Sequence, residues 1–247
     1  VCGSHELDPS LNCIDFSVSH ETFAIAQCKN CNLLITTPRP EISRLGQYYE
    51  SEKYISHKKG VNSILDFFYK ITRVYTLNWK LRMIQTHSVQ CQSLLDYGCG
   101  TGTFLKKTEQ TRIKSFGVEP SPKARQTASK LSSSEVAETI DQLNVTVDVV
   151  TLWHVLEHVP DLNSTLQKIY ERLNKNGTMF IAVPNCESAD AKHYKQHWAG
   201  YDVPRHLWHF SKKNMILLLQ KNNFTVTSII PMKLDAFYVS ILSEKYQ

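Results

Sequence analysis

The chain has 247 residues, of which 42% are hydrophobic and 21% are charged. This composition supports a hydrophobic core and excludes a wholly disordered chain. The apolar runs are far shorter than the roughly 18 residues that a membrane-spanning helix needs, and no signal peptide opens the chain, so we expect a cytoplasmic protein without a membrane span. The net charge of +5 permits an anionic partner but does not require one.

A pair of cysteines marks the first 40 residues. Cys28 and Cys31 lie between two β-like runs, 23–26 and 33–37, which is typical of a zinc knuckle in a β ribbon. Cys2 resembles the end of a second pair whose first cysteine the sequence does not contain. We therefore expect Cys2, Cys28 and Cys31 to bind a structural zinc ion, with reduced free thiols as the alternative. Three residues are candidates for a further ligand: His5, Cys13 and His20.

The remaining chain is predicted to contain a connecting region and an α/β domain. Apolar residues from Ile64 to Leu81 recur at helical spacing, which indicates a long amphipathic helix. After residue 91, short apolar strands alternate with helices. This alternation predicts a Rossmann-like α/β fold, with a parallel-rich sheet and helices on both faces. The expected regions are a zinc-ribbon-like segment, a helical connecting or lid region and the α/β domain, over residues 1–40, 41–90 and 91–247.

Local patterns place the elements of this domain. Helices are predicted to begin after Ser121, Asp161 and Ser211, and Gly177 is predicted to end the second of them. Segment 235–242 is compatible with a last strand or with a helix. The predicted strands span 93–97, 115–119, 135–137, 147–153, 178–183 and 225–230, and a further helix is predicted near 103–110.

A glycine-rich turn follows the first of these strands. Gly98, Gly100 and Gly102 are spaced G-x-G-x-G, and Asp96 lies just before them. Glycines allow the main chain to turn sharply and to approach a ligand closely. A dinucleotide site favours G-x-G-x-x-G, and a carboxylate there would repel its pyrophosphate. Asp96 suits the ammonium group of S-adenosylmethionine, so this cofactor is predicted.

Other cofactor contacts are expected at neighbouring strand ends. Glu119 ends the next strand and is placed to accept hydrogen bonds from ribose hydroxyl groups, with Pro120 beside it. Cys99 belongs to the turn by position. Trp153 and His154 end the fourth strand, at the carboxyl edge where open α/β sheets bind ligands.

Two segments resemble a known family. Residues 94–102 resemble the cofactor motif of class I S-adenosylmethionine-dependent methyltransferases, and Glu119 looks like that family's ribose-binding acid. Residues 148–160 resemble the fourth strand and following loop of the subgroup that includes ubiquinone-pathway O-methyltransferases. A preceding zinc ribbon also resembles some bacterial methyltransferases of sugars and natural products. The resemblance implies methyl transfer to a small-molecule, sugar or lipid-like acceptor at oxygen or carbon.

Residues 154–158 also match H-x-x-E-H, an inverted zinc-protease signature. That chemistry requires both histidines on one face of a continuous helix. Pro160 disfavours helix at the preceding residue and leaves room for about one turn. The sequence therefore disfavours a peptidase.

The methyltransferase interpretation gives these histidines another role. Methyl transfer to a hydroxyl group is helped by a base, and histidine suits this role near neutral pH. His154 is the first candidate base and His158 the second. In the alternative, Glu157 and His158 only brace the loop.

An aromatic and histidine-rich segment, 197–210, is predicted to form a lid or acceptor wall. Its candidate polar groups are Tyr201, Arg205 and His206, and His206 is a third catalytic candidate. Arg205 paired with Asp202 is the structural alternative.

Three other functions remain as alternatives. A nucleic-acid methyltransferase could use a basic helix face, but the Asn/Asp-Pro-Pro-aromatic motif typical of base-amine methylation is missing after the fourth strand. A non-catalytic cofactor-binding module and an NAD-dependent enzyme are distinguished by assays of turnover and of nicotinamide binding. The basic residues of that helix face are Lys70, Arg73, Lys80 and Arg82.

Overall fold

The computed structural model describes residues 1–41, 44, 46–49 and 63–247, without the side chains of 63–72. The chain forms two compact units. Residues 42–43, 45 and 50–62 of the predicted connecting region, and the Lys70 side chain, lie outside the described residues. Unit 1 comprises Val1–Val61, Glu157–Asn163 and Val183–Gln247, and unit 2 comprises Asn62–Leu156 and Ser164–Ala182.

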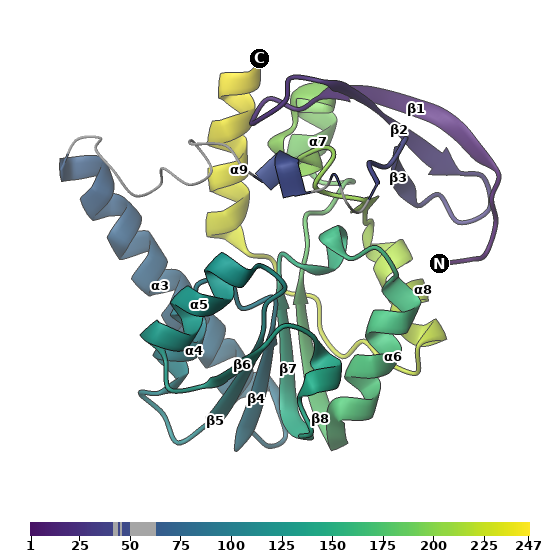
Figure 1. Cartoon of the computed structure of the whole chain (residues 1–247). Coiled ribbons are helices and arrows are strands. Elements are labelled where there is room, and N and C mark those ends of the chain that lie inside the picture. The colour runs from purple at the N-terminus through teal and green to yellow at the C-terminus, as the bar shows by residue number, and fades with distance from the viewer. Residues whose placement is uncertain (42–43, 45, 50–62) are drawn as a thin grey trace. The chain divides into compact units, whose positions relative to one another are not determined.

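Unit 2 is built on a five-stranded sheet (Figure 1). Its strands are β4 (Ser93–Tyr97), β5 (Lys114–Val118), β6 (Glu135–Ala137), β7 (Val147–Trp153) and β8 (Leu173–Ala182). They lie in the order β6-β5-β4-β7-β8, and every neighbouring pair is parallel. Six of the seven residues of β7 are buried, so it forms the centre of the core. The predicted α/β fold is confirmed.

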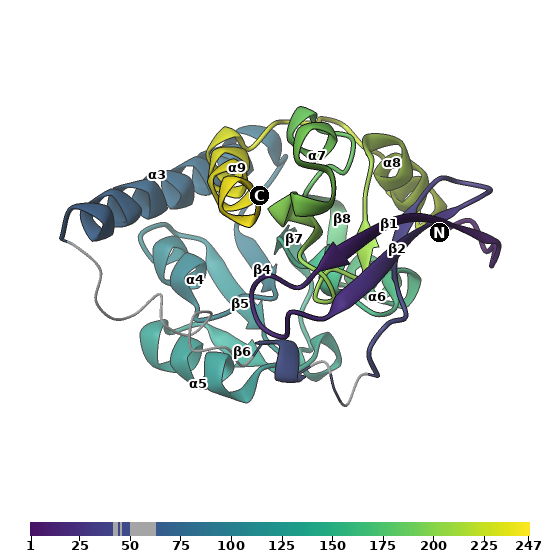
Figure 2. The same cartoon turned by 90° about the horizontal axis from the view of Figure 1, so that it is seen from above.

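Helices cover both faces of this sheet. Figure 2 shows α4 and α5 on one face and α6 on the other. The Ser121 side chain caps α5 by accepting a hydrogen bond from the Ala124 main chain, as predicted. The helical elements between residues 63 and 172, of which 157–163 belong to unit 1, are α3 (Ser63–His87), α4 (Thr103–Thr108), α5 (Pro122–Leu131), η2 (Ile140–Gln142), η3 (Leu156–His158) and α6 (Leu162–Arg172).

The junction between α6 and β8 differs from the prediction. Helix α6 ends at Arg172 and β8 begins at the next residue, so Gly177 lies inside the strand. Asn176 has a φ of 65°, the left-handed conformation expected of a helix-ending glycine. Gly177 is needed for space, because a Cβ there would lie 2.9 Å from the Asn174 carbonyl oxygen.

Unit 1 contains a small antiparallel sheet, which confirms the predicted N-terminal ribbon. Its strands are β1 (Leu7–Ile14), β2 (Thr22–Cys28), β3 (Leu34–Thr37) and β9 (Trp208–His209), in the order β1-β2-β3-β9. Strands β1 and β9 are additions to the prediction. The helical elements of unit 1 are η1 (Gly46–Tyr49), α7 (Ala189–Tyr194), η4 (Lys195–His197), η5 (Ala199–Tyr201), α8 (Lys212–Lys221) and α9 (Lys233–Tyr246).

One predicted strand, in the C-terminal part of unit 1, is wrong. Residues 225–230 form no strand, although their β-branched residues predicted one, and Ile229 and Ile230 are exposed. Strand propensity depends on packing against neighbours, which this segment lacks on that exposed side. Segment 235–242, left open between strand and helix, lies in α9. Ser211 caps α8 as predicted.

In the described part of the chain, no helix has the length and apolar character to cross a membrane.

Candidate active site

The glycine-rich turn joins β4 to α4, and its three glycines serve different needs. Gly98, Gly100 and Gly102 have φ angles of 76°, 56° and 77°, a region that favours glycine. A Cβ on Gly98 would lie 2.5 Å from the Val155 side chain, and one on Gly102 would lie 2.8 Å from Ala128. A Cβ on Gly100 would meet no described atom within 4 Å. Gly98 and Gly102 therefore permit packing, whereas Gly100 leaves its face open to a ligand.

Glu119 lies directly beside this turn. Its Oε2 accepts a hydrogen bond of 2.8 Å from the main-chain N–H of Gly100, and its Oε1 accepts one of 2.9 Å from Ser121. Arg125 donates to the main-chain oxygens of Glu119 and Pro120, at 2.7 and 2.9 Å. The carboxylate at the end of β5 is thus held at the open glycine.

Asp96 is the second acid of the site. It is 3% exposed, and its Oδ1 accepts a hydrogen bond of 2.7 Å from the Thr151 hydroxyl group. Burial raises the pKa of the Asp96 carboxyl to about 6, while the Thr151 hydrogen bond and the positive charge of Lys80 oppose this rise. A cationic ligand would therefore strongly favour its ionised form.

An aromatic side chain ends β7. Trp153 packs edge to face against Phe104, and the Lys80 ammonium group lies 4.6 Å from the centre of its ring. The Trp153 Nε1 is buried and has no hydrogen-bond partner among the described residues. A buried unpaired donor of this kind marks a place for an acceptor group of a ligand.

The Cys99 side chain lies in the core, where it is not placed to contact a ligand. It packs with Leu105, Ala128 and Val136, and its sulfur would be 2.8 Å from a Cβ on Gly117. Burial raises the pKa of this thiol to about 12, so it stays neutral. Cys99 can contribute to ligand binding through its main chain.

His154 leaves β7 in an unusual conformation. Its φ is 59°, which is rare for a residue with a side chain, and its main-chain N–H donates to the Ala182 oxygen at 2.9 Å. Such strain is often found at functional sites. The following helix, η3, has three residues. The continuous helix that an H-x-x-E-H protease requires is therefore missing from 154–158, as predicted.

The comparisons with known proteins agree with this geometry. A family model described as "Methyltransferase domain" matches residues 36–229. The chain belongs to the class I S-adenosylmethionine-dependent methyltransferases. Its parallel sheet and glycine-rich turn agree with the resemblance found in the sequence.

This methyltransferase matches only part of the length of its curated relatives. The bovine protein "Ubiquinone biosynthesis O-methyltransferase, mitochondrial" is 24% identical over 181 residues, which are 64% of this chain and 49% of the relative. The "Ubiquinone biosynthesis O-methyltransferase" of Nitrosomonas europaea is 30% identical over 105 residues, 38% of this chain and 44% of the relative. The chain spans just under half the length of both.

Solved structures share the fold at low identity. Mycolic acid cyclopropane synthase, complexed with SAH and CTAB, has a TM-score of 0.55 and 15% identity, covering 72% of this chain and 69% of that one. Magnesium protoporphyrin IX methyltransferase from Synechocystis PCC 6803, with bound SAH, has a TM-score of 0.52 and 14% identity, covering 75% and 85%. Both support the Rossmann-like fold.

A second group of titratable side chains lies within unit 1 of the methyltransferase. Ligand atoms of Glu157, His158 and His206 lie within 4.8 Å of one another. His158 Nδ1 donates to the Arg205 carbonyl oxygen at 3.0 Å, and His206 Nδ1 donates to that of Gly200 at 2.9 Å, because a carbonyl oxygen can only accept. With Nδ1 donating in each ring, the Nε2 atom is left to accept a proton or to bind a cation.

Burial and charge keep His158 neutral. Desolvation and the neighbouring His206 lower its pKa to about 4, against the opposing effects of Glu157 and Asp202. His206 Nε2 lies 3.9 Å from Glu157 and 4.0 Å from Asp202. A neutral His158 is in the protonation state that a base requires.

Arg205 is a structural residue. It is 1% exposed and binds Asp15 at 2.8 Å, Asp202 at 2.6 Å and the Tyr48 main-chain oxygen at 2.9 Å. Asp15 is completely buried and also accepts from three main-chain N–H groups of the following turn. The predicted alternative, in which Arg205 pairs with Asp202, is confirmed. Tyr201 is also buried, and it packs against Trp198.

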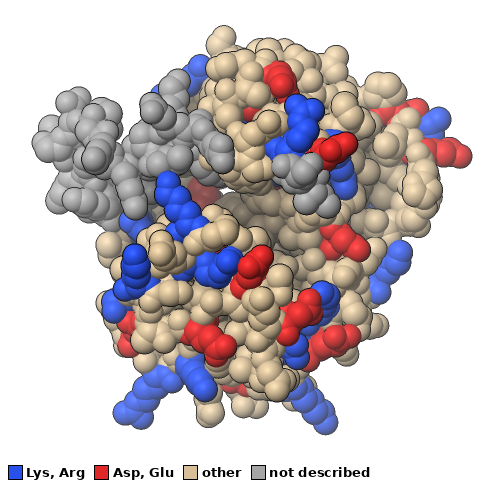
Figure 3. Space-filling view, in the orientation of Figure 1, with Lys and Arg blue, Asp and Glu red and all other residues tan. Residues whose placement is uncertain are grey.

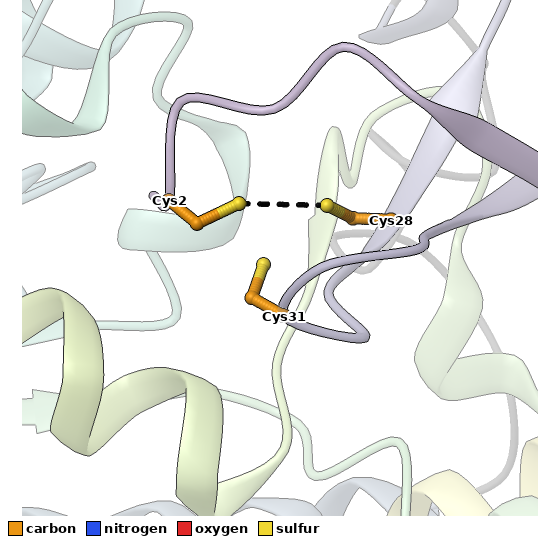
Figure 4. Close-up of side chains that lie close together, drawn as sticks. All are labelled: Cys2, Cys28 and Cys31. Atoms are coloured by element: carbon orange, nitrogen blue, oxygen red, sulfur yellow. Dashed lines mark hydrogen bonds between the residues drawn. The ribbon is translucent and has the colours of Figure 1, made fainter.

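The third group consists of thiols in unit 1. Figure 4 shows Cys2, Cys28 and Cys31 with their sulfurs directed toward one another. The Cys2 and Cys28 sulfurs lie 3.5 Å apart, and all three lie within 4.8 Å of one another. A hydrogen bond from the Ser4 main chain lowers the pKa of Cys2 to about 7. Cys13 packs in another cluster with Phe23, and within the described residues neither His5 nor His20 joins the three thiols.

Three residues of these sites escaped the sequence analysis. Thr151 binds Asp96 across two strands, Arg125 fixes the main chain at Glu119, and Asp15 pairs with Arg205 from 190 residues away. Thr151 lies opposite Asp96 in the register of β4 and β7, a pairing between residues 55 positions apart. No local pattern connects Asp15 with Arg205.

Proposed function

We propose that this chain transfers the methyl group of S-adenosylmethionine to a hydroxyl group of a small-molecule acceptor. The observation that carries the proposal is the pairing of Glu119 with Gly100, which puts a fixed carboxylate beside an open stretch of main chain. Asp96 and the unpaired Trp153 Nε1 lie at the ends of the two adjacent strands. These groups fit a nucleoside that carries a cationic amino acid.

Each residue has a distinct binding role in this proposal. Glu119 accepts hydrogen bonds from the ribose hydroxyl groups, and Pro120 and Gly100 shape the wall around them. Asp96 attracts the ammonium group, while Gly98 and Gly102 hold the turn in place. The bound cofactor supplies a methyl group already activated on a sulfonium. The protein then lowers the barrier chiefly by aligning the acceptor and excluding water.

The acceptor hydroxyl group needs a base, for which His154 remains the first candidate. It follows β7 directly and its main chain is fixed in a strained conformation. His158 and His206 remain the second and third candidates, because each has an Nε2 able to accept a proton. Proton transfer by a positioned histidine contributes about 100- to 10,000-fold to rate.

Two observations favour a small acceptor over a nucleic acid. Two relatives carry the name ubiquinone biosynthesis O-methyltransferase, which supports a small-molecule acceptor methylated at oxygen. Basic and acidic side chains are interspersed on the face seen in Figure 3. Several helix cations are paired with acids, including Lys106 with Glu109 and Arg125 with Glu138. Nucleic-acid binding favours unpaired basic patches.

A cytoplasmic location remains part of the proposal.

Calorimetric titration with S-adenosylmethionine tests the site. Asp96→Ala and Glu119→Ala should each weaken binding at least about tenfold, since each removes a charged hydrogen-bond partner. Glu171→Ala removes an exposed acid of α6 and should bind like the unaltered chain. Equal affinity in all four proteins would contradict the proposal.

Turnover with a mixture of phenolic and sugar acceptors tests catalysis. His154→Ala should retain cofactor binding and lose transfer. Binding without turnover in the unaltered chain would indicate a non-catalytic module, and nicotinamide binding in place of S-adenosylmethionine would indicate a dehydrogenase.

A further inference from the structure

The three clustered thiols have the geometry of a metal site. With zinc–sulfur bonds of about 2.3 Å, tetrahedral zinc places its sulfur ligands about 3.8 Å apart. The separation of 3.5 Å between Cys2 and Cys28, and the limit of 4.8 Å for all three, are close to this value. All three cysteines are free of disulfide bonds.

The main chain on both sides of the cluster is shaped alike. Gly3 follows Cys2 with a φ of 88°, and Asn32 follows Cys31 with a φ of 60°. The turn at Cys28 is closed by hydrogen bonds of its main chain with Asn32 at 2.8 Å and Leu33 at 2.9 Å. Each chain segment therefore reverses immediately after presenting a sulfur, which brings residues 26 positions apart to one point.

The cluster is anchored to a helix of the same unit. Asn214 of α8 donates to the Cys31 main-chain oxygen at 2.6 Å, and Lys221 donates to that of Val1 at 2.9 Å. Cys2 and Cys31 also line a groove of about 670 Å³ beside α8. This groove leaves one side of the cluster accessible to a fourth ligand and to an added chelator.

We infer that Cys2, Cys28 and Cys31 bind one zinc ion, which ties the N-terminus to the β2–β3 turn and to α8. Soft thiolate ligands select zinc over magnesium or calcium. Binding releases the thiol protons and joins each sulfur to the metal without any redox change. The ion stabilises unit 1 and takes no part in methyl transfer, because its ligands share no residue with the proposed cofactor site.

Metal content of the full chain, purified in reducing buffer without chelator, tests this inference. We expect about one zinc per chain. Cys28→Ser and Cys31→Ser should bind zinc at least about 100-fold more weakly, since loss of even an outer-shell partner costs 10- to 100-fold. Cys91→Ser, which alters a half-buried cysteine of unit 2, should keep its zinc.

Cobalt substitution and hydrogen exchange provide readouts that do not depend on activity. Cobalt added to the metal-free chain should give a thiolate charge-transfer band, lost in Cys28→Ser. Chelation should speed amide exchange in β2 and β3 and leave β4 and β7 unchanged. Zinc retained in Cys28→Ser, cobalt bound without that band, or a disulfide among these cysteines in reducing buffer would overturn the inference.

Discussion

The two compact units hold their charged groups in opposite ways. In unit 2, Glu119 is bound by main-chain N–H groups beside a glycine that leaves space for a ligand. In unit 1, Arg205 and Asp15 are almost completely enclosed and satisfy one another. The first arrangement leaves space for a ligand beside the carboxylate, whereas in the second the buried charges are already paired with each other. Substitutions in the Arg205–Asp15 cluster should therefore mainly affect stability, and substitutions at the open face of the turn should mainly affect binding.

The largest effect is expected from Arg205→Met. Removing this guanidinium leaves the Asp15 carboxylate buried without its cation, which costs about 3 to 5 kcal/mol. Denaturant unfolding should show this loss. Lys168→Met provides the matched control, because Lys168 pairs with Asp141 at an exposed site, and it should cost much less stability than Arg205→Met. Similar losses in both variants would contradict the description of the Arg205 cluster as structural.

Gly98→Ala and Gly100→Ala should separate packing from binding within one turn. Gly98→Ala combines a strained φ with a 2.5 Å contact to Val155, so unfolding free energy should fall by about 2 to 4 kcal/mol. Gly100→Ala brings strain without a clash and should cost about 1 to 2 kcal/mol.

Cofactor titration completes this comparison. Gly100→Ala should lose affinity more than tenfold beyond its modest effect on folding, because its methyl group would enter the space left for the ligand. Unchanged affinity in Gly100→Ala would show that the cofactor lies elsewhere.

The sequence predicted the parts of the molecule that depend on local patterns. The strand at 147–153, the Ser121 cap and the glycine turn follow from hydrophobic runs and from residue types with one main conformational use. The Cys28–Cys31 turn was likewise predicted from a local pattern. The glycine turn, together with the acid before it, also predicted the class of cofactor.

The failures occurred where distant segments decide the outcome. The 225–230 segment has strand-forming residues but remains irregular, since propensity alone does not make a strand. Asn176 took the conformation expected of Gly177. The Asp15–Arg205 pair joins residues 190 positions apart, and one sequence gives no sign of such a contact.

His158 should make stability depend on pH. Burial lowers its folded pKa to about 4 from an ordinary value of 6.5, so the unfolded chain takes up this proton first on acidification. This contribution to unfolding free energy is fully present above pH 6.5 and is lost as pH falls toward 4, by about 3 kcal/mol. His158→Gln should lose less stability than the unaltered chain over this range. His193→Gln, at an exposed position of α7, should follow the unaltered chain, and a matching response in His158→Gln would contradict the assignment.

Asp96 should make cofactor affinity depend on pH. Its carboxyl has a raised pKa of about 6 because it is buried, and only its ionised form attracts the ammonium group of the cofactor. Affinity should therefore be greatest above pH 6 and should fall by up to about tenfold for each pH unit below it. Asp96→Asn should bind more weakly at pH 7 and lose this dependence, while His158→Gln should retain it. A pH dependence that survives in Asp96→Asn would place the titrating group elsewhere, and would remove Asp96 from the cofactor site.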